Sequence, residues 1–573
     1  MAGNLMNIKT GRFAIIEQLL TDGITYMYGN PGTVEQGFLD ALESYTNFKY
    51  ILTLQETIAV AIADGYARKT KKPAVVQLHS GVGLGNGIGM IYQARRGHSP
   101  LVVIAGEAGI KYDAMDAQMA ADLVAMAEPV TKWATRVVDT SSLLRILRRA
   151  IKMAATPPMG PVFIDIPMDI LDAPIEEEII PSSLLYTQTW PKEEKIKEIA
   201  EILAAASNPI ILIGDGIAFS SAQQELTEAA ELIGAEVWGA DSSEVNMKAS
   251  HPQFRGFLGH MFGEHSKRIT RKADAVLICG TYIFPEVFPA LKEIFDINAK
   301  VIHIDLDSYE IAKNFPVDIG IVSDPKPTLK KLCDILEKTM TSEQKRSANL
   351  RRVKITKEKK ADLEKAFEKD AALKNALPLH PSVFMQELAR HLPKDAIIFD
   401  EALTSSPELN RYIPADNPGN YFQTRGGSLG VGIPGALGLK LAAPDKIVIG
   451  FTGDGGSMYT IQALWTAAHY NIGAKFIICN NKSYNLLKLN IMQYWREGKI
   501  PEHSFPESFD LDNPAIGFAK LSESLGVPAV RVDRHEQIEP AIQKMLEIDG
   551  PFLIDLSISN EVPEYLVDCK CGQ

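Results

Sequence analysis

The sequence has few cysteines, and they follow no pairing pattern. Five occur among 573 residues, and all are far apart except Cys569 and Cys571 near the C-terminus. An odd, scattered set does not suggest a disulfide framework and is typical of a protein from a reducing compartment. We do not interpret the terminal Cys-Lys-Cys as a metal site.

An excess of basic charge and long apolar runs are missing as well. The 59 basic and 71 acidic residues give a net charge of −12, which argues against a nucleic-acid partner because phosphate binding needs a basic face. No stretch of about 18 uncharged apolar residues predicts a transmembrane helix. Residues 1–20 lack the charged region and the continuous apolar region of a signal peptide. A soluble, cytoplasmic protein is therefore the expectation.

Short apolar runs that alternate with helical patterns are abundant. They indicate parallel strands buried by helices on both faces of a sheet, and the length predicts about three domains on a prior of roughly 100 to 200 residues each. We expect three doubly wound parallel α/β domains at residues 1–175, 195–340 and 375–565, an acidic linker at 176–194 and a solvated, charged helix at 342–372. The runs that predict strands are YILTL (50–54), PAVVQLH (73–79), PLVVIAG (100–106), PVFIDIP (161–167), PIILIG (209–214), AEVWGA (235–240), DAVLICG (274–280), KVIHIDLD (300–307), DAIIFD (395–400), KIVIGFT (446–452), AKFIIC (474–479) and PFLIDLSI (551–558).

Glycine and polar residues end two successive strands of the third domain. The run KIVIGFT stops at GDGG (453–456), and after a helical pattern the run AKFIIC stops at NNKS (480–483). A strand-to-helix turn offers backbone N–H groups to a phosphate, and a carboxylate beside a phosphate needs a cation between them. Because parallel strands end at one sheet edge, Asp454 and Asn481 can meet at one ion, and their oxygens suit magnesium. The spacing predicts a site for a diphosphate and magnesium.

A turn of the GDG type is weak evidence by itself, since the chain contains a second one. The GDG at 214–216 also follows an apolar strand, but the position that corresponds to Asn481 falls at Ser242, and no paired asparagines lie nearby. We interpret Asp215 as an ordinary turn residue. Only the combination of GDG with two asparagines at the next strand end is informative.

The combined motif resembles the signature of thiamine-diphosphate enzymes, and nearly the whole chain is similar to the branch that contains benzoylformate decarboxylase, other 2-oxo-acid decarboxylases and acetolactate synthase. The likeness is greatest to the benzoylformate decarboxylase group. The segments that carry it are YGNPGTVEQGFLDAL (28–42), LQETIAVAIADGYAR (54–68), LHSGVGLGNGIG (78–89), GHSPL (97–101), RGGSLGVGIPGALG (425–438) and ALWTAAHYNI (463–472). In such enzymes the cofactor lies between the first domain of one subunit and the third domain of another, which implies a homodimer or a homotetramer.

The resemblance assigns roles around the two rings of the cofactor. Glu56 matches the glutamate that hydrogen-bonds the pyrimidine N1′ and so supports removal of the thiazolium C2 proton. Judged by itself, it could equally be a helix first-turn glutamate that interacts with the helix dipole. Asn30, Pro31 and Gly32 match the segment near the pyrimidine. Leu429 falls where the family places the large apolar residue that bends the two rings, the alternative being a core leucine.

Further cofactor contacts are implied in the third domain. Thr404 and Ser457 align with positions that approach the diphosphate, although both residue types are common in turns. Ser483 joins Asp454 and Asn481 as an implied metal ligand. The set is completed by Gly427, Gly455, Gly456 and Tyr484.

Histidines bear on the substrate. His79, at the end of a predicted strand, matches a histidine that faces substrate in the decarboxylases, and a histidine near its usual pKa can hold or donate a proton near neutrality. A structural histidine is the alternative for His79 and our interpretation of His98. Thr33 stands where the benzoylformate enzymes carry a smaller hydroxyl residue, and we assign it to the substrate pocket.

One expected histidine is absent. The benzoylformate enzymes carry a second active-site histidine after a strand of the middle domain, and that position falls near Val287 here. We expect His260 and His265 to be exposed loop residues instead of substitutes. The adjacent-histidine pair of pyruvate decarboxylases also has no counterpart. Without the second histidine, release of an aldehyde competes with carboligation to a second carbonyl.

Three hypotheses follow. The first is a decarboxylase of 2-oxo acids that uses thiamine diphosphate and magnesium, with carboligation as a further activity. The second is a flavin-free carboligase similar to acetolactate synthase. The third is a catalytically silent binding protein on the same fold, against which Glu56, Asp454 and Asn481 together argue.

Overall fold

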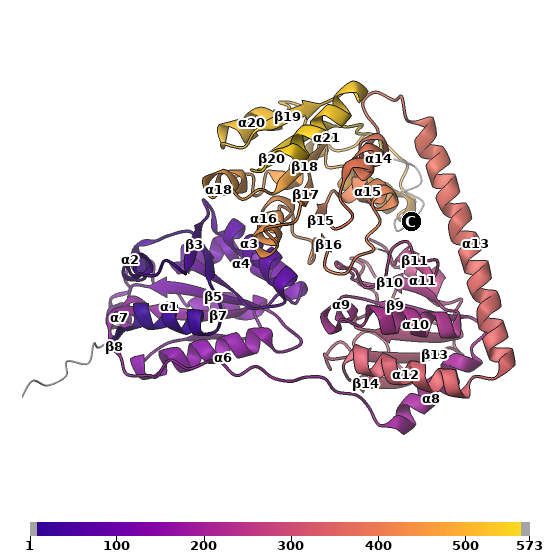
Figure 1. Ribbon diagram of the computed structural model, residues 1–573, viewed down its shortest axis with the longest axis horizontal. Helices are drawn as coiled ribbons and strands as arrows, with labels where there is room; N and C mark the ends of the chain where they lie inside the picture. Colours follow the sequence, from indigo (N-terminus) through magenta and orange to yellow (C-terminus); the bar gives the residue numbers. More distant parts are fainter. Residues whose placement is uncertain (1–8, 260, 563–573) are drawn as a thin grey trace, which may run out of the picture.

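The strands build three six-stranded sheets and one small antiparallel pair. The computed structural model describes residues 9–259 and 261–562. In each large sheet every neighbouring pair of strands is parallel, and helices pack against the sheets (Figure 1). The predicted fold class, three doubly wound α/β domains, is confirmed.

The N-terminal sheet has the strand order β3-β2-β4-β5-β7-β6. Its strands are β2 (Tyr26–Gly29), β3 (Lys49–Leu52), β4 (Ala74–His79), β5 (Leu101–Glu107), β6 (Ala134–Arg136) and β7 (Val162–Pro167), and β1 (Lys9–Thr10) pairs with β8 (Pro174–Ile175) beside it. Its helices are α1 (Gly11–Thr21), α2 (Gln36–Leu42), α3 (Glu56–Thr70), α4 (Ser80–Arg96), α5 (Leu123–Ala127), α6 (Leu143–Ala155) and α7 (Met168–Asp172). Successive residues of β4 point to opposite faces, so Val75 packs in the core of α1 and α6 while Val76 packs in the core of α3 and α4.

The middle sheet has the order β11-β10-β9-β12-β13-β14. Its strands are β9 (Pro209–Ile213), β10 (Glu236–Gly239), β11 (Phe254–Phe257), β12 (Ala275–Cys279), β13 (Lys300–Asp305) and β14 (Ile319–Val322). Its helices are α8 (Glu193–Ala205), α9 (Gly216–Ser220), α10 (Gln223–Ile233), α11 (Glu264–Thr270) and α12 (Pro325–Thr339). Residues 176–192 before it contain no helix or strand.

The C-terminal sheet has the order β16-β15-β17-β18-β20-β19. Its strands are β15 (Ile397–Glu401), β16 (Tyr421–Gln423), β17 (Val448–Gly453), β18 (Lys475–Asn480), β19 (Ala529–Val532) and β20 (Phe552–Ser557). Its helices are α14 (Pro381–His391), α15 (Ser406–Tyr412), α16 (Gly432–Ala442), α17 (Asp454–Ser457), α18 (Ala463–His469), α19 (Asn485–Glu497), α20 (Phe518–Ser524) and α21 (Ile538–Glu547).

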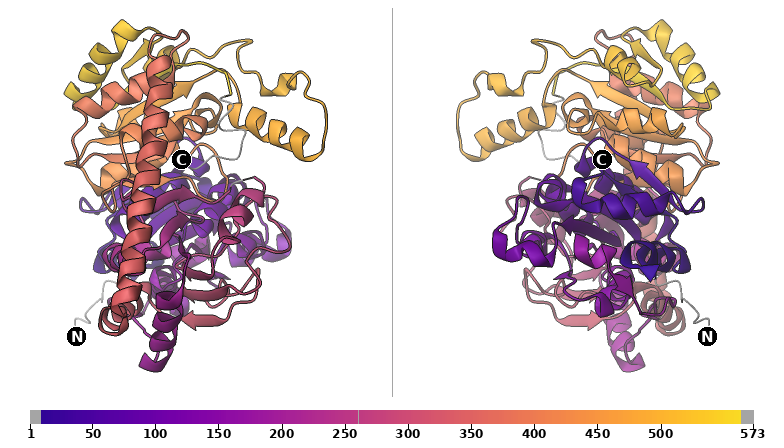
Figure 2. Two further views of the ribbon diagram at one scale, coloured as in Figure 1. Left: turned by 90° about the vertical axis from the view of Figure 1, so that its right-hand side faces the viewer. Right: turned by 90° about the vertical axis from the view of Figure 1, so that its left-hand side faces the viewer.

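A single long helix connects the middle domain to the C-terminal domain. It is α13 (Ser342–Ala372), which runs along the outside of the molecule between the two domains (Figures 1 and 2). Its buried residues are Ala348, Ile355 and Asp370, and most of the others are exposed. The prediction of a solvated charged helix at 342–372 is confirmed.

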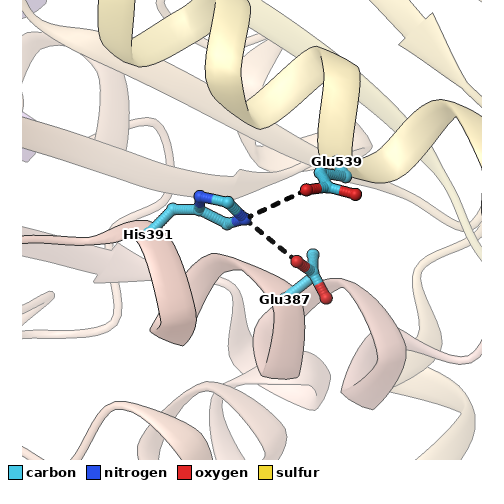
Figure 3. A group of neighbouring side chains, drawn as sticks. All are labelled: Glu387, His391 and Glu539. Atoms are coloured by element: carbon cyan, nitrogen blue, oxygen red, sulfur yellow. Dashed lines mark hydrogen bonds and ion pairs between the residues drawn. The ribbon is translucent and has the colours of Figure 1, made fainter.

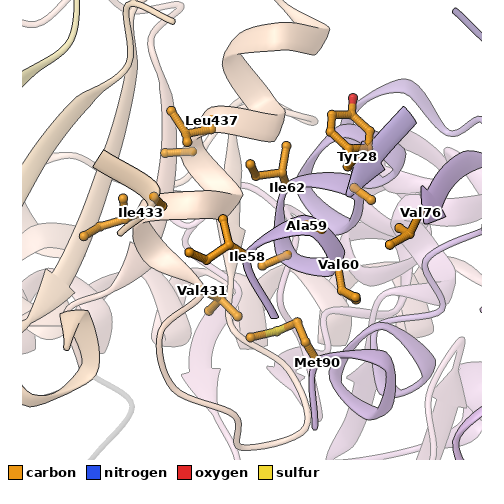
Figure 4. Packing of buried hydrophobic residues seen from close by; sticks show 14 of the residues in the cluster. Tyr28, Ile58, Ala59, Val60, Ile62, Val76, Met90, Val431, Ile433 and Leu437 are labelled. Atoms are coloured by element: carbon orange, nitrogen blue, oxygen red, sulfur yellow. The ribbon is translucent and has the colours of Figure 1, made fainter. Parts of the chain in front are cut away.

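The two terminal domains share one hydrophobic core. Helix α3 of the first domain packs against α16 of the third (Figure 4). Glycines allow the close approach, because a Cβ at Gly65 would lie 2.3 Å from the carbonyl oxygen of Gly435 and one at Gly438 would lie 2.0 Å from that of Ile62. The middle domain has hydrophobic clusters of its own.

The sequence patterns predicted the inner strands better than the edges. All four edge strands of the middle and C-terminal sheets were missed, namely β11, β14, β16 and β19, as were β2 and β6. Edge strands are not buried on both faces, so they lack continuous apolar runs. In β14, for example, buried and exposed residues alternate.

Two local predictions were wrong. The glycines at residues 81–89, after β4, predict a turn, but this segment forms the first turns of helix α4. Its glycines let the helix pass close to neighbouring groups, as at Gly87, where a Cβ would lie 3.2 Å from Leu78. The helical pattern after GDGG is broken into α17 and α18, because the amides of residues 459, 460 and 463–465 bond to the carbonyl three residues earlier, as in a 3₁₀ helix.

Candidate functional site

The first group of site residues lies at the carboxyl ends of neighbouring strands in the N-terminal domain. Asn30 follows β2, Glu56 opens α3 shortly after β3, and His79 ends β4. The strands are adjacent in the sheet and parallel, so their ends meet at one edge. Gly83 of α4 lies between two of these side chains, since its Cβ would be 3.1 Å from Glu56 and 3.3 Å from His79.

Glu56 is buried and held by two amide donors. Only 6% of the surface of this residue is exposed. One carboxylate oxygen accepts from Asn30 Nδ2 at 3.3 Å and the other from Asn86 Nδ2 at 3.0 Å. Asn86 was not predicted, because its role depends on helix α4 passing over the start of α3.

His79 is oriented by a carboxylate that the sequence analysis missed. Its Nδ1 lies 2.9 Å from Oε2 of Glu35, whose Oε1 accepts from the Gly106 amide at 3.0 Å. Burial raises the pKa of Glu35, while the contacts with His79 and Gly106 oppose that rise. Since Nδ1 faces a carboxylate, it is the nitrogen expected to carry the proton, which leaves Nε2 for other partners. Glu35 lies two residues after Thr33 in the chain, and this nearness to a predicted site residue was the signal by which the sequence could have identified it.

The segment 30–33 lies against the histidine. A Cβ at Gly32 would be only 1.9 Å from His79 Nδ1, so a glycine is required there by space. Pro31 and Thr33 are exposed beside it, and Thr33 begins the 3₁₀ turn η1 (Thr33–Glu35). The structure therefore gathers all of the predicted N-terminal site residues around Glu56 and His79.

The second group lies at the carboxyl edge of the C-terminal sheet. Asp454 follows β17 and Asn481 follows β18, which are paired strands. Oδ2 of Asp454 and Oδ1 of Asn481 accept from the same donor, the amide of Ser483, at 3.3 and 2.9 Å. Two oxygens that converge on one donor in a buried place form a donor set that suits a hard cation. Burial raises the pKa of Asp454 to about 6, against the lowering effect of amides that include Gly455.

The turn beside this pair fits a phosphate-bearing ligand. The short helix α17 begins at Asp454 of the GDGG segment, so a helix N-terminus lies at this sheet edge. Gly455 packs against the ring of Tyr484, because a Cβ there would lie 2.3 Å from the ring. Ser457 is buried and donates to the Asp454 carbonyl at 2.8 Å.

A buried glutamate beneath the turn was also missed. Glu401, at the end of β15, accepts from the amide of Gly430, from that of Gly432 at 2.6 Å and from the Thr452 hydroxyl at 3.2 Å. Burial raises its pKa to about 7, although these donors favour the charged form. A Cβ at Gly456 would lie 3.2 Å from its Oε1. Glu401 is therefore a link between the Leu429 segment and the GDGG turn.

The other predicted contacts surround this edge. Leu429 is half-buried and belongs to no hydrophobic cluster of the described chain, which does not fit a core leucine. Thr404 is half-buried in the 3₁₀ turn η5 (Leu403–Ser405). Gly427 is exposed with a φ of +76°, a conformation that favours glycine.

Asp215 and His98, to which the sequence analysis gave no role in the site, each contact another domain. The interpretation of Asp215 as an ordinary turn residue was wrong, because it is buried and forms an ion pair with Arg425. His98 is half-buried, its ring contacts Phe219, and burial is the main reason that its pKa falls to about 4. This environment fits a structural histidine.

The missing histidine has no replacement at its own position. Val287 is exposed there. The prediction of an exposed loop was wrong for His265, which lies half-buried in α11 with its ring edge against Trp238. His260 lies outside the described residues, as do Cys569 and Cys571.

A separate cluster of metal-type ligands lies between α14 and α21 (Figure 3). His391 Nε2 is 3.0 Å from Glu387 Oε1 and 3.9 Å from Glu539 Oε1. Both carboxylates have other partners, since Arg390 lies 2.6 Å from Glu387 Oε2 and Gln543 donates to Glu539 at 3.2 Å. Ion pairs and hydrogen bonds account for this cluster, and we assign no metal to it.

Comparisons with known proteins agree with this arrangement. The chain matches the models of the thiamine pyrophosphate enzyme N-terminal TPP binding domain at residues 9–126, central domain at 196–332 and C-terminal TPP binding domain at 404–556. It is 30% identical over 554 residues to a benzoylformate decarboxylase of Pseudomonas aeruginosa, covering 96% of this chain and 99% of that protein. It is 29% identical over 560 residues to a probable acetolactate synthase large subunit of Methanococcus aeolicus, covering 96% and 92%.

A solved structure supports the same conclusion. The thiamine diphosphate-dependent 4-hydroxybenzoylformate decarboxylase of Rhodococcus jostii RHA1 matches with a TM-score of 0.84 at 26% identity, over 97% of this chain and 100% of that one. The chain therefore belongs to the thiamine pyrophosphate enzymes. Within that family it falls in the branch of decarboxylases and acetolactate synthases. Among the described helices, none is long and apolar enough to cross a membrane.

Proposed function

We propose that this chain is a decarboxylase of 2-oxo acids that depends on thiamine diphosphate and magnesium, is similar to benzoylformate decarboxylase and also carries out carboligation to a second carbonyl. The observation that carries the proposal is the pair of half-sites. One holds a buried glutamate beside an oriented histidine, and the other holds converging oxygens of Asp454 and Asn481 beside a glycine turn. Bound thiamine diphosphate would supply a nucleophilic carbon able to attack a ketone and accept the electrons of the bond to CO₂.

The proposed roles follow from the contacts of each residue. Asp454, Asn481 and Ser483 would hold magnesium and, through it, the diphosphate, with the amides of the GDGG turn as further donors. Thr404, Ser457, Gly427 and Tyr484 would line the cofactor, and Leu429 would support its rings. In the first half-site, Asn30, Pro31 and Gly32 would lie along the pyrimidine, and Glu56 would accept or donate the N1′ proton. His79 would hold or donate a proton at its Nε2 next to the substrate, with Thr33 in the pocket.

We further propose that a second copy of the chain completes each site, in a homodimer or homotetramer. No hydrogen bond or ion pair within residues 9–259 and 261–562 joins the two half-sites. Large apolar side chains are exposed beside both: Leu54 and Val82 near Glu56 and His79, and Met458 and Tyr459 after the GDGG turn. Exposed apolar groups around polar site residues are typical of an interaction surface.

A carboligase similar to acetolactate synthase is the second candidate. The exposed Val287 at the position of the missing histidine favours it, because one proton donor near the substrate is absent there. Slow protonation lengthens the time in which a second carbonyl compound can react. The 29% identity to a probable acetolactate synthase large subunit of Methanococcus aeolicus also supports this candidate.

One experiment separates these functions. The protein, loaded with thiamine diphosphate and magnesium, is incubated with pyruvate, benzoylformate or branched 2-oxo acids, with and without an acceptor aldehyde. Free aldehyde as the main product supports the decarboxylase, and hydroxyketone or 2-hydroxy-2-methyl-3-oxo acid as the main product supports the carboligase. Release of no CO₂ from any of these acids would contradict both and favour a silent binding protein.

Replacement of His79 tests the substrate side of the site. We expect His79→Ala to lower kcat/KM for the best substrate by about 10²-fold, the lower range for a positioned acid or base. Glu35→Gln should give a loss of about tenfold, because the amide can no longer define which histidine nitrogen carries the proton. Steady-state kinetics on the loaded enzyme checks both. His391→Ala, at a surface ion pair, is the control and should leave kinetics unchanged; unaltered kinetics in His79→Ala would remove this residue from the site.

The environment of Asp454 predicts a pH dependence of cofactor binding. Its raised pKa, about 6, means that the folded apoprotein favours the protonated form below that pH. A metal needs the carboxylate, so protons and magnesium compete. We expect the magnesium-dependent affinity for thiamine diphosphate to fall about tenfold for each pH unit below about 6. Titration of intrinsic fluorescence between about pH 5 and pH 8 measures it, and an affinity that does not change over this range would contradict the assignment.

A further inference from the structure

The segment that carries Leu429 is rich in glycine, so its backbone needs outside contacts to hold one conformation. Gly426, Gly427 and Gly430 all have positive φ, at 67°, 76° and 86°. Glycine loses more conformational freedom on folding than any other residue. A side chain that must press on a ligand from such a segment needs restraints at both ends.

The C-terminal end of the segment is fixed inside its own domain. The amide of Gly430 and that of Gly432 donate to the two oxygens of Glu401, and the carbonyl of Gly430 accepts from the Thr460 hydroxyl at 2.6 Å. Leu429 is therefore bonded to a residue whose amide and carbonyl are both held.

The N-terminal end is fixed to the middle domain. Arg425 is buried, with 7% of its surface exposed. Its guanidinium forms ion pairs with Asp215 and with Asp241, the second at 3.1 Å. It also donates to the carbonyl of Asp241 at 2.5 Å and to that of Arg96 at 3.0 Å. A planar guanidinium with several acceptors has a defined orientation, unlike an ammonium group.

Asp215 is itself held by the middle domain. Its carboxylate accepts from the amides of Ser243 and Glu244 at 2.9 and 3.0 Å and from Asn246 Nδ2 at 2.9 Å. Burial opposes its ionisation, but Arg425 and the Ser243 hydroxyl bring its pKa down to about 2. The acceptor of Arg425 is thus charged and immobile at neutral pH.

The chain just before Arg425 is docked on the same middle-domain segment. The amide of Gln423 donates to the Ser243 carbonyl at 2.7 Å. Arg68 of α3 donates to the carbonyls of Gln423 and Ser243, at 2.9 and 3.1 Å. The middle domain therefore contacts the Leu429 segment directly at its start.

We propose that Asp215 and Arg425 are positioning residues: through this buried pair the middle domain fixes the segment 425–430 and so the place where Leu429 meets the cofactor. The restraint on segment 425–430 is inferred from the geometry alone, whereas the statement that Leu429 meets the cofactor rests on the proposed function. It assigns a use to the second GDG turn of the chain, whose carboxylate binds a guanidinium instead of a metal.

The test compares two buried pairs of the same chemistry. Asp215→Asn and Arg425→Lys weaken the proposed restraint. Asp370→Asn is the matched control, because Asp370 pairs with Arg411 at 2.6 and 2.7 Å, is also buried and joins α13 to α15 without bonding to residues 425–430. Amide hydrogen exchange of peptides that cover 425–432 is measured in the full-length protein without cofactor, and the Kd for thiamine diphosphate is measured by fluorescence titration with magnesium.

The expected results are specific to the segment. Exchange at 425–432 should become faster in Asp215→Asn and in Arg425→Lys but not in Asp370→Asn. The Kd should rise about 10- to 100-fold in the first two variants, the range found for residues that orient the direct ligands of a site. In a Leu429→Ala background, Asp215→Asn should add little to the Kd, since both changes act on one contact, and Asp370→Asn should have the same small effect as in the wild type.

Other results would overturn the proposal. Exchange at 425–432 that is unchanged in Asp215→Asn, or effects of Asp215→Asn and Leu429→Ala on the Kd that simply add, would show a pair that only joins two domains. If Asp215→Asn does not fold, Arg425→Lys decides, because it keeps the charge. A wild-type chain that binds no thiamine diphosphate would contradict the proposed function, whereas the exchange measurement would still decide the restraint.

Discussion

Glu56→Gln is expected to lower turnover by about 10³- to 10⁴-fold, at the upper end of the range for loss of an acid or base, while thiamine diphosphate still binds. The two amides of Asn30 and Asn86 hold the carboxylate of Glu56 in place, and an amide side chain has nearly the same shape. What the variant loses is a group that can exchange a proton with the cofactor.

The same variant separates the two interpretations of Glu56. A first-turn glutamate that only interacts with the helix dipole contributes about 0.3 to 1 kcal/mol to stability. In that case Glu56→Gln would lower the free energy of unfolding slightly and leave kcat unchanged. Turnover under saturating cofactor, cofactor Kd and thermal unfolding are the three measurements.

A matched control is available in the middle domain. Glu286 is also buried, has a pKa raised by burial and accepts from Ser266. Glu286→Gln should change stability at most and leave kcat as in the wild type. Wild-type turnover in Glu56→Gln would contradict the proton-transfer role.

Asp454→Ala is expected to raise the Kd for thiamine diphosphate by about 10²-fold or more, because loss of a direct metal ligand should exceed the 10- to 100-fold effect of residues one shell further out. The reason is the geometry at Ser483, where Oδ2 of Asp454 and Oδ1 of Asn481 converge. Without the carboxylate, the amide oxygen alone cannot hold a divalent cation against a diphosphate.

The dependence on magnesium makes this result diagnostic. In the wild type, adding magnesium should tighten cofactor binding strongly, and in Asp454→Ala this increment should largely vanish. Asp395→Ala, which removes an exposed carboxylate of the same domain from its pair with Lys446, serves as control. An unchanged response to magnesium in Asp454→Ala would rule out the metal role.

Local sequence patterns predicted the fold class and most of the inner strands. The inner strands are buried on both faces, so their residues are apolar one after another, and the pattern is visible in the chain itself. The edge strands β14 and β19 mix exposed with buried residues, so they lack the continuous apolar run that marks an inner strand. The glycines after β4 favour a turn when read from the sequence, yet they belong to helix α4, where Gly83 allows a close approach to Glu56 and His79.

The candidate site divides in the same way. The sequence by itself determined which strand ends carry Asp454 and Asn481, because parallel strands joined by a helix must end at one edge. Only the tertiary structure decided that Glu35 faces His79, that Asn86 faces Glu56 and that Glu401 holds Gly430. It also decided that Asp215, 210 residues before Arg425, is its ion partner. Such pairs leave no periodic trace in a sequence, because each is set by how separate elements pack and not by the spacing of residues within one element.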